Sequence, residues 1–330
     1  MSAAAPPVES GSRTADLRRL LAERPEIALG IVLLGLIVVT HFASETGFLT
    51  ARQLSNTVQI AAPLGIIAAG QTLVMLTAGI DLSVANTATA AAYVMASQEE
   101  RGTFVAILFG LAVGLVVGLF NGIGVGVFRV NPLIMTLGTA TIIVGAMTIF
   151  SQSSYATNVS DVPRFVKEIG GGRLLEYVPT SLLLWAPLAL LIILALRYSG
   201  LGRMLYAVGD NPRACRLAGV RVWQVQIAVY ALCGTLAALA GIVLAGFTSN
   251  VDLSLGSSYL LPSVAAVVIG GTSIFGGVGG YSGTIFGALI LTVLSALLTL
   301  LDAPQELKTI VYGSIILVLA WAYAALSRST

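Results

Sequence analysis

Charged residues are scarce in this chain of 330 residues, because Asp, Glu, Lys and Arg together make up only 10% of it. Soluble domains carry about a quarter, so a soluble protein is excluded. There is one histidine, His41, and there are two cysteines, Cys215 and Cys233. The cysteines lack metal-ligand spacing, and two are too few for a disulfide framework. Without a cluster of His, Cys and carboxylate groups, we expect neither a metal site nor an integral-membrane enzyme.

Lysine is rarer still. The only two, Lys167 and Lys308, follow Val166 and Leu307, so no Gly-Lys-Ser/Thr sequence exists and the chain has no phosphate-binding P-loop. Residues 270–283 include seven glycines but lack the spacing of a dinucleotide-binding fingerprint. Tight helix packing around a turn explains this segment better. We therefore expect no ATP site and no cofactor on this chain.

Apolar residues, by contrast, make up 57% of the chain. A bilayer requires about 20 consecutive apolar residues per helix. Ten segments approach this length: 26–44, 54–78, 82–97, 103–128, 132–151, 179–197, 224–247, 259–275, 282–301 and 307–326. The third and eighth are short and adjoin Gly-rich or polar turns, which predicts broken or re-entrant helices. The sequence thus predicts an all-α integral membrane protein with about ten transmembrane helices.

The distribution of charge predicts the orientation. With residues 1–24 as a cytosolic tail, eleven of the seventeen cations but only five of the fifteen acids lie on the cytosolic side, as the positive-inside rule requires. The predicted organisation is this tail, a transmembrane permease domain over 25–327 with a cytosolic loop at 198–223, and a cytosolic end at 328–330. Two five-helix halves would imply an inverted repeat, and the Gly-rich turns near 79 and 276 suggest such a correspondence without establishing it. The net charge of +2 does not suggest a nucleic-acid partner.

Asp81, in the short turn between the segments 54–78 and 82–97, is the only acidic residue that this orientation leaves within the membrane. Gly79 breaks one helix and Asp81 can cap the next, which alone would account for the carboxylate. Intramembrane carboxylates are also functional candidates, and a capped break is a natural hinge. Amide side chains also lie within the apolar segments, namely Asn56, Gln59, Gln71, Asn86 and Asn121. They either hydrogen-bond between helices or line a wet path for neutral, hydroxylated cargo.

The loop 198–223 contains signals for one very short helix. Asn211 suits the N-cap, Pro212 the first helical position, and Gly219 the left-handed residue after the last turn. A helix of two turns is unstable alone in water. The segment is therefore either an ordered connection between spans or a helix that docks into a partner protein.

Together these segments resemble the membrane permeases of ATP-binding-cassette importers of the ribose/xylose type. The resemblance covers roughly residues 50–320, and its motifs lie at 70–74, 79–84, 131–139, 202–220 and 268–277. Three features depart from the family pattern. Ala78 stands where a second Gly is common, Ala85-Asn86 replaces a usual Gly-Ser, and Arg213 replaces a small or acidic residue.

The resemblance implies a multi-pass permease subunit in a bacterial inner membrane, within the lipid. It would import a small sugar delivered by an extracytoplasmic sugar-binding protein, with ATP-Mg hydrolysed on a separate cytosolic ABC ATPase, and would pair with a second permease copy or a paralogue. Residues 211–219 then resemble the coupling helix that seats in the ATPase. Ala214, Leu217 and Ala218 would form its apolar face, with Arg213 and Arg216 pointing elsewhere.

Other readings stay open. Related permeases handle branched-chain amino acids, nucleosides or a sugar-like signal. A secondary transporter or channel would need no ATPase, but ion coupling favours more than one intramembrane carboxylate, and only Asp81 is available.

Overall fold

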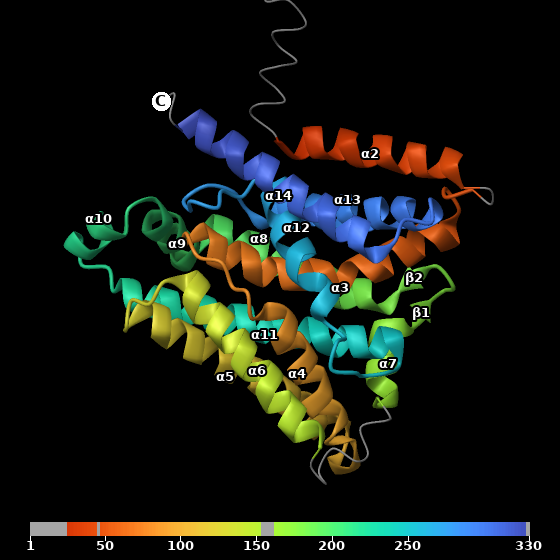
Figure 1. The fold of residues 1–330 in the computed structure, drawn as a ribbon, viewed down its shortest axis with the longest axis horizontal. Coiled ribbons are helices and arrows are strands. Elements are labelled where there is room, and N and C mark those ends of the chain that lie inside the picture. The colour runs from red at the N-terminus through yellow and green to blue at the C-terminus, as the bar shows by residue number, and fades with distance from the viewer. Residues whose placement is uncertain (1–24, 45–46, 153–161, 328–330) are drawn as a thin grey trace, which may run out of the picture.

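The computed structural model describes residues 25–44, 47–152 and 162–327 (Figure 1). The predicted tails at 1–24 and 328–330 lie outside these residues. Ten helices correspond to the ten predicted segments: α2 (Pro25–Ala43), α3 (Ala51–Leu76), α4 (Val84–Ala96), α5 (Thr103–Gly126), α6 (Pro132–Ser151), α8 (Thr180–Tyr198), α11 (Val222–Thr248), α12 (Leu260–Ile269), α13 (Tyr281–Leu300) and α14 (Gln305–Ser327). The prediction of an all-α membrane protein is confirmed.

Helix lengths distinguish full spans from broken ones. Among the described residues, seven helices are long and apolar enough to cross a bilayer: α2, α3, α5, α6, α8, α11 and α13. α4 has 13 residues and α12 has 10, so the third and eighth segments are short, as predicted. A long helix followed by a short one occurs in each half, as α3–α4 and as α11–α12. An inverted repeat predicts this order, but the relation between the halves stays a prediction.

The connections contain elements that the sequence analysis did not predict. The loop 152–178 includes α7 (Arg164–Gly171), and after it β1 (Arg173–Leu174) pairs antiparallel with β2 (Val178–Pro179). The loop 198–223 contains α9 (Gly200–Asp210) before α10 (Pro212–Leu217). Two single 3₁₀ turns, η1 (Glu99–Arg101) and η3 (Ser257–Tyr259), precede α5 and α12. In Figure 1, α10 and the end of α14 lie towards one side of the molecule, and α7 with its hairpin towards the other.

The core is built around α3, which is buried along most of its length. Its Gly65 lies against the ring of Trp185 in α8, where any side chain would overlap the indole. The Trp185 Nε1–H donates to the hydroxyl of Tyr281 (2.8 Å), which in turn donates to the carbonyl of Gly65 (2.8 Å). Three helices, α3, α8 and α13, are thus joined by one buried hydrogen-bonded chain.

Among the described residues, α5 and α11 share the most extensive contact between two helices. Every fourth residue of α5 is a glycine that faces α11 or its neighbours: Gly110, Gly114, Gly118, Gly122 and Gly126. A Cβ on Gly114 would overlap the carbonyl of Gly234, and one on Gly118 would overlap that of Tyr230. We call these five residues the glycine ladder. Small residues allow the two backbones to approach closely, and this close approach gains dispersion energy. The two helices therefore pack as a unit.

Candidate coupling helix and intramembrane break

Helix α10 has the three local features that the sequence predicts. The Asn211 Oδ1 accepts hydrogen bonds from the backbone amides of Arg213 (3.1 Å) and Ala214 (3.0 Å). Pro212 is the first helical residue, and Gly219 has a φ of 85° directly after the last turn. The predicted cap, start and end of this helix are confirmed.

Almost all of α10 faces outward. Only Cys215 among its residues is buried, whereas the side chain of Leu217 is 91% exposed. The other exposed residues of the segment are Asn211, Pro212, Arg213, Ala214, Arg216, Ala218 and Gly219. α10 projects from one edge of the molecule (Figure 1). An exposed leucine beside small residues on a projecting helix suits a partner protein.

Helix α9 connects α10 to the membrane core by backbone contact. A Cβ on Gly209 would overlap the carbonyl oxygen of Leu76 at the end of α3, and would lie 2.5 Å from the Gly277 nitrogen. That nitrogen donates to the same Leu76 carbonyl (3.1 Å), and the Tyr206 hydroxyl donates to the carbonyl of Gly279 (2.9 Å). The glycine-rich segment 270–283 thus packs tightly around a turn, as predicted. α9, the end of α3 and this turn form one contiguous contact.

The chain breaks between Leu76 and Val84. Ala78 has a φ of 60°, a left-handed conformation that glycine adopts freely and that costs an L-residue roughly 1–2 kcal/mol. A strained alanine therefore stands within the break. Tertiary contacts must compensate for that cost.

Asp81 lies in this break and is 1% exposed. Its Oδ1 accepts from the Ser83 backbone amide (2.8 Å) and from the Ser83 hydroxyl (2.6 Å). The N-cap of α4 is Ser83 rather than Asp81, so the prediction of a direct cap was wrong. The carboxylate instead closes the turn before the helix. In the orientation that satisfies both of its polar atoms, the side-chain amide of Gln71 donates to the backbone C=O of Asp81 (3.2 Å) and accepts from its backbone N–H (3.3 Å).

Helices α5 and α6 hold the break from the other side. The Asn121 Nδ2 donates to the Ser83 hydroxyl (2.9 Å), and its Oδ1 accepts from the Thr139 hydroxyl (2.6 Å). Asn86 Nδ2 donates to the carbonyl of Ala140 (3.3 Å). Gln71, Asn86 and Asn121 therefore bond between segments in this conformation, which is one of the two alternatives for these amides. Buried polar groups paired in this way specify one arrangement of the break.

Two residues of α11 near the break were missed by the sequence analysis. Cys233 is fully buried and lies beside the Asp81 carboxylate. Tyr230 is also fully buried, and its hydroxyl has no hydrogen-bond partner in the part of the chain that the structure describes. A Cβ on Gly79 would lie 2.6 Å from that hydroxyl. Nothing in the sequence of this apolar helix indicates that its tyrosine and cysteine lie near the break.

Asn56 and Gln59 belong to a separate cluster near the start of α3. The Gln59 Nε2 donates to the carbonyl of Gly170 in α7 (3.1 Å). The Arg173 guanidinium donates to Asn56 Oδ1 and, at 3.5 Å, to Gln59 Oε1. The two amides thus share Arg173 as a partner, and their contacts are with the α7 loop rather than with Asp81.

Along the outward face of α6, a line of small and hydroxylated residues runs between larger exposed apolar residues such as Ile134, Ile142 and Ile149. The exposed positions of this line, at spacings of three and four, are Gly138, Thr141, Gly145, Thr148 and, just after the helix, Gln152. These spacings place all five on one face. The two glycines have no neighbour within 4 Å of an added Cβ. We call this face the α6 stripe.

The chain matches known transport proteins over most of its length. The family described as the branched-chain amino acid transport system / permease component matches residues 53–320. The ribose import permease protein RbsC of Escherichia coli (strain K12) is 37% identical over 290 residues, which are 87% of this chain and 90% of the relative. The fructose import permease protein FrcC of Rhizobium meliloti is 34% identical over 92% of this chain and 86% of the relative. The autoinducer 2 import system permease protein LsrC of Yersinia pseudotuberculosis is 34% identical over 86% and 79%.

Proposed function

Because this chain belongs to the permease-component family of the branched-chain amino acid transport systems, we propose that it is the membrane subunit of an ATP-driven sugar importer. It is a multi-pass inner-membrane protein, with seven helices suited to spanning among its described residues. Two relatives are named for ribose and fructose import, which supports a small sugar as cargo. The autoinducer 2 relative supports a sugar-like signal as the second candidate. An extracytoplasmic binding protein would deliver the cargo and select between them.

The exposed coupling helix is the observation that carries the ATP-driven mechanism. α10 presents Leu217 to a cytosolic ATPase, on which ATP-Mg would bind and be hydrolysed. Closure of the ATPase pushes α10, and the push passes through α9 at Gly209 to the end of α3 and the glycine-rich turn. Both contacts adjoin the break at 77–83, where the paired side chains of Asp81, Gln71 and Asn121 can exchange between two arrangements. The break is the hinge of alternating access.

The α6 stripe supports a second permease copy. Lipid favours apolar side chains at exposed positions, whereas small and hydroxylated residues favour close helix packing or a polar path. We place the partner copy against Gly138 and Gly145, with Thr141 and Thr148 lining the route for a hydroxylated cargo.

A cysteine cross-link tests this pairing. Thr141→Cys is expected to give a covalent dimer in native membranes with a short thiol-specific cross-linker, because Thr141 lies within the α6 stripe and the two copies of a position near a two-fold axis lie close together. The native Cys215 and Cys233 are buried and give little background. Leu190→Cys on exposed α8 is the matched control and should stay monomeric. Equal cross-linking of both variants would place the interface elsewhere.

Leu217→Arg tests the proposed ATPase partner. A buried, unpaired guanidinium in an apolar docking groove costs roughly 3 kcal/mol or more, so ATPase affinity should fall by more than about 100-fold. We expect loss of uptake, with normal membrane insertion and no ATPase co-purifying with the tagged chain. Leu217→Met keeps an apolar side chain of similar volume and should retain both properties. Wild-type uptake by Leu217→Arg would refute the docking role of α10.

A further inference from the structure

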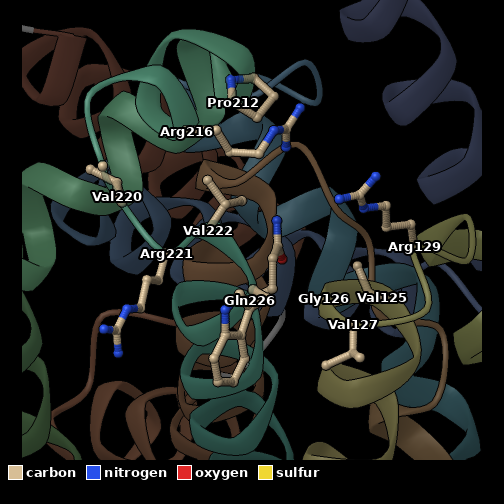
Figure 2. A pocket seen from close by; sticks show the side chains of 12 residues that line it. Val125, Gly126, Val127, Arg129, Pro212, Arg216, Val220, Arg221, Val222 and Gln226 are labelled. Atoms are coloured by element: carbon tan, nitrogen blue, oxygen red, sulfur yellow. The ribbon is translucent and has the colours of Figure 1, made fainter.

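A cavity of about 740 Å³ separates the coupling helix from the ends of two spans (Figure 2). Its walls come from the end of α5, the turn before α6, α10 and the start of α11. Leu217, the proposed contact for the ATPase, does not line it. The cavity therefore lies on the inner side of α10, apart from the surface assigned above to the ATPase.

The cavity collects positive charge without a counter-charge. Arg129, Arg216 and Arg221 line it, and none of its lining residues is acidic. Figure 2 shows the guanidinium groups of Arg129 and Arg216 turned towards the same part of the cavity, while Arg221 extends from the opposite side. Arg129 has a φ of 56°, so the turn holds it there in a backbone conformation rare for residues with a side chain. Converging guanidinium groups suit a phosphate, which they bind through paired hydrogen bonds.

The apolar walls identify the source of that phosphate. Val125, Val127 and Val222 line the cavity together with Trp223, and Val127 and Trp223 are each about half exposed. Tryptophan is enriched at the level of lipid headgroups, and basic pockets between helices on the cytoplasmic side bind anionic headgroups. A free anion gains nothing from such walls, whereas acyl chains can run along the exposed apolar sides of α5 and α11.

We propose that this cavity binds the phosphate headgroup of an anionic phospholipid, held by Arg129 and Arg216 with its acyl chains against Val127 and Trp223. The lipid bridges α10 to the turn between α5 and α6, because Arg216 and Arg129 come from these two elements. It thereby holds the coupling helix against the membrane before any ATPase is bound. The proposal does not depend on the cargo or on ATP-driven transport.

The test measures lipid binding to the full-length purified chain. Phosphatidylglycerol, phosphatidylethanolamine and inorganic phosphate are each added to the protein in a neutral detergent, and thermal unfolding and native mass spectra are recorded. We expect phosphatidylglycerol alone to raise the unfolding temperature. In the double variant Arg129→Gln/Arg216→Gln the affinity should fall roughly 30-fold, since each arginine near a membrane surface contributes a factor of about five. Arg203→Gln, an exposed arginine on α9 outside the cavity, should bind like wild type.

Each other outcome overturns the proposal. Equal stabilisation by inorganic phosphate would identify a small-anion site instead of a lipid site. Unchanged affinity in a folded double variant, or an equal loss in Arg203→Gln, would show that the lipid binds elsewhere. Absence of lipid selectivity, combined with loss of ATPase co-purification in the double variant, would assign the arginines to the partner protein. If the double variant fails to fold, the single Arg129→Gln and Arg216→Gln variants provide the same comparison.

Discussion

Gly209→Ala is expected to abolish sugar uptake while the ATPase stays bound to the chain. The added Cβ would overlap the Leu76 carbonyl and approach the Gly277 nitrogen, so α9 must move away from the end of α3. α10 and its exposed Leu217 are unchanged, which preserves docking. Movement of the ATPase would then no longer reach the break that contains Asp81. Uptake of labelled sugar and ATPase co-purification, measured on the same membranes, separate these two effects.

Gly200→Ala is the matched control at the start of the same helix. A Cβ there has only the end of the Arg203 side chain at 4.0 Å. In open positions, alanine in place of a helical glycine stabilises by about 0.5–1 kcal/mol. Gly200→Ala should therefore keep uptake and slightly raise stability, whereas Gly209→Ala should lose uptake. Normal uptake by Gly209→Ala would remove α9 from the proposed transmission path.

Replacing two rungs of the glycine ladder, in Gly114→Ala/Gly118→Ala, is expected to destabilise the folded protein by roughly 3 kcal/mol or more. Each methyl group would meet a backbone carbonyl of α11, at Gly234 and Tyr230, and backbone cannot rotate aside as a side chain can. The two helices must separate, and the dispersion energy along their whole contact falls. Thermal unfolding of the purified protein and its yield of monodisperse material measure the loss.

Gly35→Ala in α2 controls for the change of residue type. No atom lies within 4 Å of an added Cβ at this position. We expect a small rise in stability there, from the higher helix propensity of alanine. A ladder variant as stable as Gly35→Ala would show that α5 and α11 are not in backbone contact.

Hydropathy and capping chemistry were enough to locate the spans and the short helix α10. The predicted segment 132–151 coincides with α6, because Asn131 and Pro132 begin it and Gln152 follows it. The short helix at α10 was predicted from Asn211, Pro212 and Gly219 because its ends depend on local hydrogen bonds and backbone angles. Signals of this kind need no knowledge of the rest of the chain.

Tertiary contacts determine what the sequence analysis missed. The eight residues of α7 are too few to be stable alone, and they form a helix with Val166 and Gly170 buried, the latter against the α11 backbone. α9 depends similarly on the contact of Gly209 with Leu76. The partner of Asn56 and Gln59, Arg173, lies more than a hundred residues away in a polar loop. A periodic glycine face is visible in α5, but the sequence does not say which helix covers it.

The glycine ladder also sets an order of events during synthesis. Gly126 and Val222 are separated by roughly 100 residues, so at roughly 5–20 residues per second α11 emerges about 5 to 20 s after α5 is complete. During this interval ladder residues that α11 covers, such as Gly114, Gly118 and Gly122, lack their partner helix and must be covered by acyl chains or by the insertion machinery. α11 then displaces them, because its backbone lies in direct contact with these glycines in the folded chain. The newly inserted permease therefore passes through a stage in which α5 is already in the membrane while α11 is still on the ribosome.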